Sequence, residues 1–354
     1  MTVVISDVRD YLNLDQPIGI GEFLLAIAGA LGDAMADPEL LGWDPMKEGY
    51  WVRVRNFMAR TKVELGTVDL GPSGLRANLK DDSSFRAKLG EHMAGRIGAL
   101  LDDVRTFVAE IVAALRKRLG DETKIVYILD SIEHIAVPAE DHRAVTDALE
   151  RLFTLHADKL GFEDLHLIYT VPPWLKVRAP GIDGLYQGAY LLPCIKVHDR
   201  DGARVEAGVR VLTEIIARRA PAGEWQRLLS EAQLERLIEQ SGGYIRDLFQ
   251  LVRTCLMSAP SNMPLSDAKV ELAIAQLKND YLPAISHQDA RWLARIARTH
   301  ESELASEDGL PDLSRYFDTH LMLCYRNGVE WYDVHPLIAD EVEAMVARLD
   351  RGER

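Results

Sequence analysis

Two hydrophobic patterns alternate along the first 200 residues of the chain. Short apolar runs of the length of a buried strand are separated by stretches with the helical period of about 3.6 residues. We predict an α/β fold in which the runs are parallel strands of one sheet, and the second run, apolar at nearly every position, is a central strand. The runs are TVVISDV (2–8), KIVYILD (124–130), LHLIYTV (165–171) and YLLPCIKV (190–197).

Helical periodicity covers most of the chain between and after these runs. A segment LGTVDLGPSG, closed by glycines and a proline, predicts a small strand or hairpin at 65–74. After His198 the strand pattern stops and an all-helical region follows. The predicted helices are 20–36, 51–64, 84–119 and 143–160 before His198, and 205–219, 231–240, 244–258, 266–277, 287–299 and 313–317 after it.

The last 35 residues change pattern again. Two alternating runs flank Arg326-Asn327-Gly328, and Asn-Gly between such runs is a strong hairpin signal. The segment HPLIADEVEAMV then predicts a final helix. Helices, one hairpin and a last helix form the order of a winged helix.

Composition narrows the class of protein. The charged fraction is 27% and the hydrophobic fraction 47%, which is typical of globular proteins. The formal charge of −14 predicts that neither nucleic acid nor an anionic membrane is a partner. No apolar stretch is long enough to cross a bilayer. The cysteines Cys194, Cys255 and Cys324 form no C-x-x-C pair, which favours a reducing, cytoplasmic location.

The sharpest candidate site is YILDSIE, where an apolar strand ends in Asp130 and Glu133 follows three residues later. In an open parallel sheet, ligands bind outside the carboxyl ends of the strands. Asp130 is therefore placed to hold a Mg²⁺ bound to phosphate oxygens, and Glu133 to orient a water molecule. The alternative is that Asp130 only caps the next helix.

Two further motifs supply polar side chains. Thr170 ends the next predicted strand, which would place its hydroxyl beside Asp130 if the two strands are neighbours; β-propensity alone also explains a threonine there. In SGGYIRDLFQL, Arg246 lies in the first turn of a predicted helix, where a cation opposes the helix dipole. Binding an anionic ligand would explain Arg246, and so would a surface pair with Asp247 or Glu239. Lys176 and Arg178 belong either to a solvated loop or to a basic finger directed at a neighbouring subunit.

Taken together, these motifs resemble AAA+ and STAND-like P-loop ATPases that end in a winged helix. YILDSIE is similar to their Walker B motif, LIYTVPP to their sensor 1 strand, and SGGYIRDLFQL to the sensor 2 motif of their helical lid. The resemblance implies a P-loop NTPase α/β core at 1–200, a helical lid at 201–262 and a winged-helix domain at 263–354. It also implies ATP and Mg²⁺ as cofactors, with catalytic Asp130, Glu133 and Thr170, and with Gly243 and Arg246 at the nucleotide.

One departure from this family is large. The chain contains no Gly-x-x-x-x-Gly-Lys-Ser/Thr and no Gly-Lys pair, so the phosphate cradle is absent. In the family, the P-loop strand precedes the one that TVVISDV resembles and lies between those matching LHLIYTV and YLLPCIKV. A misassigned start, an excised fragment and a degenerate homologue would each explain this, and the intact downstream motifs favour truncation.

The resemblance implies a nucleotide-controlled conformational switch that hydrolyses little or no ATP as this chain alone. It further implies a protein partner or a homo-oligomer. The main alternative is a catalytically dead adaptor that binds protein partners. A third possibility is a DNA-binding regulator, against which the acidic stretch before the hairpin argues, with Glu307, Asp308, Asp312 and Asp318 against Arg315.

Overall fold

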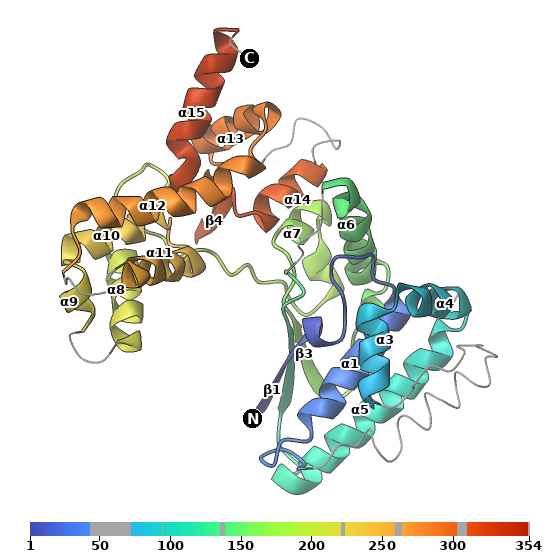
Figure 1. Cartoon of the computed structure of the whole chain (residues 1–354). Coiled ribbons are helices and arrows are strands. Elements are labelled where there is room, and N and C mark those ends of the chain that lie inside the picture. The colour runs from blue at the N-terminus through green and yellow to red at the C-terminus, as the bar shows by residue number, and fades with distance from the viewer. Residues whose placement is uncertain are drawn as a thin grey trace. The chain divides into compact units, whose positions relative to one another are not determined.

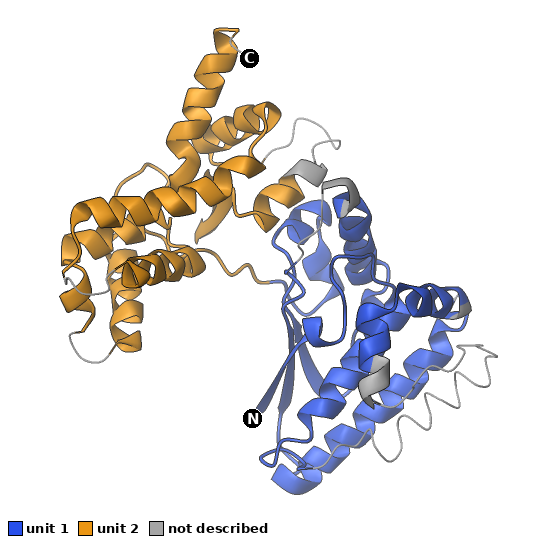
Figure 2. Ribbon diagram, in the orientation of Figure 1, with its two compact units in different colours: residues 1–189 blue, residues 190–354 orange. Residues whose placement is uncertain are grey.

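The structure is a computed structural model that describes residues 1–42, 72–93, 95–134, 139–220, 224–258, 264–302 and 310–352. The chain divides into two compact units, residues 1–189 and 190–354 (Figure 2). The predicted helix at 51–64 and most of the predicted strand or hairpin at 65–74 lie outside the described residues.

Three parallel strands form the sheet of the first unit (Figure 1). They are β1 (Thr2–Asp7), β2 (Ile125–Asp130) and β3 (Leu165–Tyr169), and β2 lies between the other two. The predicted direction and order of these strands are therefore confirmed. Their β-branched and aromatic residues favour extended backbone.

Helices pack against one face of this sheet. Ile125, Tyr127 and Leu129 of β2 point to that face and are fully buried. The stretch predicted as helical over 84–119 forms two helices, which end and begin on either side of Gly95, whose φ of 84° favours glycine. The helices of the unit are α1 (Ile20–Ala34), α3 (Pro72–Asp81), α4 (Ser83–Met93), α5 (Ile97–Leu119), α6 (Ala139–Thr154) and α7 (Trp174–Arg178).

The opposite face of the sheet is apolar and exposed. Val3 and Ile5 of β1 are 46% and 64% exposed, and Ile168 of β3 is 49% exposed. Ile5, Ile128 and Ile168 are register partners, so they form one apolar row across the strands. Parallel sheets are usually covered on both faces, so a face that the described residues of the first unit leave bare is an unusual feature.

The described residues of the second unit form helices and one antiparallel hairpin, and the hairpin lies where the sequence predicts it. The hairpin joins β4 (Met322–Asn327) and β5 (Val329–Val334) through Gly328. Leu323, Tyr325 and Trp331 form its buried core. The helices are α8 (Glu206–Arg219), α9 (Trp225–Leu228), α10 (Glu231–Gln240), α11 (Ile245–Met257), α12 (Asp267–Tyr281), α13 (His287–Thr299), α14 (Leu310–Asp318) and α15 (Pro336–Asp350).

The prediction of a fourth strand at 190–197 is wrong. This segment has no regular secondary structure, and Tyr190 and Leu192 are 89% and 95% exposed. Pro193 has no N–H to donate to a ladder. The backbone of the segment instead bonds within the second unit: the Cys194 N–H donates to the Cys324 carbonyl at 2.9 Å, and the Ile195 N–H to the Gly243 carbonyl at 3.2 Å.

The predicted division into core, lid and winged helix stays a prediction, since 190–354 forms one compact unit by its internal contacts. In the part of the chain that the structure describes, every helix is too short or too polar to cross a membrane.

Candidate functional site

The carboxyl ends of the three strands bring polar side chains to one edge of the sheet. Asp7 and Asp130 are register partners at the ends of β1 and β2. Thr170 directly follows β3, and its N–H donates to the Leu129 carbonyl at 3.2 Å. Parallel strands end at the same edge, so the sheet itself gathers these side chains.

Thr170 lies where the sequence places it, next to the end of β2. Its hydroxyl accepts a hydrogen bond from the Ser131 N–H at 2.9 Å and donates to Glu133 Oε2 at 2.7 Å. Ser131 is buried and has a φ of 74°, a strained conformation for a residue with a side chain. The hydroxyl thus ties a strained turn and a carboxylate together.

The reading of Asp130 as a helix cap does not fit the structure. Asp130 is the last residue of β2, the chain turns without a helix at 131–134, and α6 begins at Ala139. Asp130 and Glu133 are both half-buried, and the side chain of Glu133 is 30% exposed. His134 Nε2 lies 3.4 Å from Glu133 Oε1.

Sequence reasoning missed two charged residues of this edge, Asp7 and Arg9. The Arg9 side chain donates to both carboxylate oxygens of Asp7, at 3.0 Å from Nε and 2.6 Å from Nη2. These bonds lower the pKa of Asp7 to about 2, against the opposite effect of its partial burial. The signal was present, because TVVISD is also an apolar strand that ends in an aspartate.

The oxygen donors of this edge suit Mg²⁺. Nucleotide-bound magnesium usually takes one or two protein carboxylates together with waters and phosphate oxygens, and Asp130 and Glu133 could supply such carboxylates. Among the described residues, no group of three or more His, Cys, Asp or Glu side chains could hold a metal ion.

Gly243 and Arg246 belong to the second unit. Gly243 has a φ of 77°, and a Cβ there would meet the Ile195 carbonyl oxygen at 1.7 Å, so close backbone packing explains this glycine without a ligand. Arg246 is exposed in the first turn of α11, where its charge acts on Tyr244 and His320. That Arg246 shares a site with Asp130 and Thr170 stays a prediction.

Asp247 and Glu239, the two residues suggested as surface partners of Arg246, each contact other residues. Asp247 is buried, accepts a hydrogen bond from the Tyr281 hydroxyl at 2.7 Å and lies 3.0 Å from His335 Nε2. Glu239 pairs with Arg204 at 3.1 Å. Whether Asp247 or Glu239 also pairs with Arg246 stays a prediction.

Arg178 is neither solvated nor a free finger. Its side chain is 8% exposed, and its guanidinium bonds to α6, with Nε 2.8 Å from Glu150 Oε2 and Nη1 3.1 Å from the Thr146 hydroxyl. A further ion pair joins it to Asp147. Arg178 therefore anchors α7 to α6.

Comparisons with known proteins give little. No protein-family model matches the chain, and no curated protein matches it. Among solved structures, the ORC2 protein of Aeropyrum pernix, in ADPNP–ADP complexes, is similar with 15% identity and a TM-score of 0.31 over 72% of this chain and 75% of that one. A TM-score this low carries no argument about fold or function.

Proposed function

We propose that this chain is a module of an AAA+-like or STAND-like ATPase that works as a nucleotide-controlled conformational switch, with ATP and Mg²⁺ as its ligands. The observation that carries the proposal is the Thr170 hydroxyl, which joins the Ser131 N–H and the Glu133 carboxylate beside Asp130. Such an arrangement positions a carboxylate at the edge where open parallel sheets bind ligands. A phosphate-bound magnesium ion would supply the charge that both carboxylates balance.

The chain's own residues divide the work in this proposal. Asp130 holds the metal, Thr170 fixes the carboxylate of Glu133, and Glu133 orients a water molecule. Arg246, at the start of α11, reads phosphate charge from a helical lid at 201–262. The elements α12, α13, α14, β4, β5 and α15 form the winged-helix domain at 263–354. Without a Gly-rich phosphate cradle in its sequence, this chain alone hydrolyses little or no ATP.

A titration with Mg-ATP tests the switch. Hydrogen exchange at the peptides covering 128–134 and 166–172 should slow on adding Mg-ATP, and Asp130→Asn and Arg246→Gln should each weaken this response. Arg253→Gln is the matched control, because Arg253 is exposed on the same helix α11. If millimolar Mg-ATP changes no peptide, the switch proposal fails for this chain.

The bare face of the sheet favours a second candidate function, a catalytically inactive adaptor. The exposed apolar row that contains Ile5 and Ile168 could bind a protein partner or a second copy of the chain. In this case Mg-ATP has no effect, whereas Ile5→Lys removes concentration-dependent association in analytical ultracentrifugation. Association that survives Ile5→Lys, together with a nucleotide response, would favour the switch.

A further inference from the structure

The turn between α10 and α11, at 241–244, is held closely by the hairpin and by the start of α15. The Tyr325 hydroxyl, on β4, donates to the Gly242 carbonyl at 2.6 Å, and this bond is buried. A Cβ at Gly242 would meet Leu323 Cδ1 at 2.6 Å and Pro336 Cδ at 2.9 Å. The hairpin and α15 therefore reach the backbone of this turn, and only a glycine leaves room for them.

A second connection joins α11 to α15 and to α12. Asp247 Oδ2, on α11, lies 3.0 Å from His335 Nε2 and accepts a hydrogen bond from the Tyr281 hydroxyl, at the end of α12, at 2.7 Å. The side chains of Asp247 and His335 are 7% and 0% exposed. The Leu337 N–H donates to His335 Nδ1 at 3.3 Å, so the same imidazole caps α15. One buried carboxylate thus contacts side chains from two other elements.

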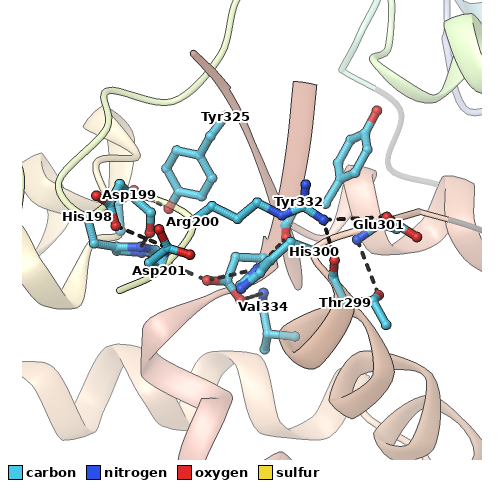
Figure 3. Close-up of polar contacts among 12 residues, drawn as sticks. His198, Asp199, Arg200, Asp201, Thr299, His300, Glu301, Tyr325, Tyr332 and Val334 are labelled. Carbon is cyan, nitrogen blue, oxygen red and sulfur yellow. Dashed lines mark hydrogen bonds and ion pairs between the residues drawn. The ribbon is translucent and has the colours of Figure 1, made fainter. Parts of the chain in front are cut away.

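The chain that leads into α8 has contacts with the same part of the second unit. The Cys194 N–H donates to the Cys324 carbonyl, on β4, at 2.9 Å. Arg200 donates to the Thr299 carbonyl, at the end of α13, at 2.8 Å and lies 3.4 Å from Glu301 (Figure 3). The helices α8 to α11 are therefore attached to the hairpin and α13 where they begin, as well as at the turn between α10 and α11.

We propose that these three connections form a rigid joint, through which the helices α8 to α11 and the elements from α12 to α15 open and move as one body. Breaking one of the buried bonds leaves a polar group without its partner and away from water, which is costly. The packing of α12 against α10, α11 and α15 acts in the same direction. A ligand or a partner that displaces α11 would therefore displace the hairpin and α15 with it. This coupling goes beyond the proposed nucleotide switch, because it holds with or without nucleotide.

Native-state hydrogen exchange at increasing urea concentration, without nucleotide, tests the joint. Residues that open together share one opening free energy and one dependence on urea. In the wild-type chain, the slowest-exchanging amides of α11, on one side of the joint, should therefore match those of β4 and α15, on the other side. Tyr325→Phe removes only the hydroxyl that bonds Gly242. It should lower protection on both sides by the same factor, about tenfold for one lost buried hydrogen bond.

Tyr186→Phe is the matched control, because it removes the same kind of bond within the first unit. The Tyr186 hydroxyl donates to the Phe153 carbonyl at 2.9 Å, and both residues belong to 1–189. This variant should leave the protection of α11, β4 and α15 unchanged.

A second variant approaches the joint from α11. Asp247→Asn removes the charge that faces His335 and should lower the protection of α15 as much as that of α11. An equal loss on both sides in a variant that circular dichroism shows to be folded supports the joint. A loss confined to the side that carries the substitution, or no loss on either side, overturns it. If neither variant folds, the wild-type chain decides, since different urea dependences for α11 and α15 would also overturn the joint.

Discussion

Asp289 in the second unit and Glu22 in the first are buried carboxyl groups whose pKa values shift in opposite directions. Asp289, on α13 of the second unit, accepts hydrogen bonds from the Ser286 N–H at 2.6 Å and the Tyr316 hydroxyl at 2.8 Å, and pairs with Arg315. Burial acts to raise its pKa, but these bonds and the charge of Arg315 outweigh it, so the pKa is lowered. Asp289 therefore stays ionised in the core.

Glu22, on α1 of the first unit, has few partners. Its carboxylate accepts one long hydrogen bond, from the Gly19 N–H at 3.4 Å. Burial raises the pKa of Glu22 to about 7, and neither this bond nor the charge of Arg86 compensates. The comparison shows that hydrogen-bond donors, more than depth, decide whether a buried carboxyl group keeps its charge.

The largest expected loss of stability comes from removing Asp289, the buried carboxylate with several hydrogen-bond donors. Asp289→Ala removes the acceptor for Tyr316 and Arg315 and should lower the free energy of unfolding by about 3 to 5 kcal/mol at pH 7. Because the pKa of Asp289 is lowered, its contribution is present above the unfolded pKa and is lost as the pH falls through the folded one. Urea unfolding at several pH values, monitored by hydrogen exchange of peptides from α13, measures both the loss of stability and its dependence on pH.

Asp280→Asn is the control for this change, since Asp280 is exposed on α12. A loss for Asp289→Ala no larger than that of this control would show that the bonds to Asp289 contribute little.

The second largest effect concerns Glu22, whose replacement should raise the stability, whereas replacing Asp289 should lower it. With a pKa raised to about 7 in the folded chain, the stability contribution of Glu22 is fully present below the unfolded pKa and is lost as the pH rises toward 7. Glu22→Gln should therefore stabilise the first unit by about 2 to 3 kcal/mol at pH 8 and change little at pH 4.5. Thermal melting at the two pH values measures the difference.

Glu39→Gln, an exposed glutamate of the same unit, is the matched control and should show no such pH dependence. Equal melting temperatures of Glu22→Gln and the wild type at pH 8 would contradict the raised pKa.

A smaller effect tests why residue 170 is a threonine: for the hydrogen bonds of its hydroxyl or only for its preference for extended backbone. Thr170→Val leaves the Ser131 N–H and Glu133 without this partner and should cost about 1 to 2 kcal/mol. Chemical denaturation monitored at the first unit measures it. Thr106→Val, on the exposed surface of α5, should be nearly neutral. If valine at 170 is stabilising, β-propensity is the better explanation of the threonine.

The smallest expected effect is at the exposed pair of Asp7 and Arg9. Because their side chains are 36% and 51% exposed, Asp7→Asn should change the free energy of unfolding by less than about 1 kcal/mol, and less still at high salt. The pKa of Asp7 is lowered to about 2, so the contribution is lost as the pH falls from 4 to 2. Melting at two salt concentrations measures it. A large loss of stability that does not depend on salt would show that the Asp7–Arg9 pair contributes as a buried pair does, like that of Asp289 and Arg315.

Local pattern was sufficient for many elements. The helix predicted at 287–299 is α13 with the same bounds, and the Asn-Gly hairpin is present. The adjacency of β2 and β3, on which the position of Thr170 depended, is also confirmed. The helix and the hairpin share a cause, since periodicity and turn residues act within a few positions of the chain.

The fourth strand failed because an apolar run does not determine its own partner. The residues 190–197 are as apolar as a buried strand, yet their backbone bonds to Gly243 and Cys324, about 50 and 130 positions further along. The missing side chain of Gly243 allows that contact. Pro193 weakens the competing strand pairing.

The sequence alone determined the three strands of the sheet, the hairpin, most helices and the candidate carboxylates Asp130 and Glu133, because these depend on local hydrophobic period and on which residue ends a strand. Only the tertiary structure decided that Thr170 bonds Glu133, that one face of the sheet is bare, and that Tyr325 bonds Gly242. Contacts of this kind join residues tens to hundreds of positions apart. Their geometry follows from how whole elements pack, which no local pattern encodes.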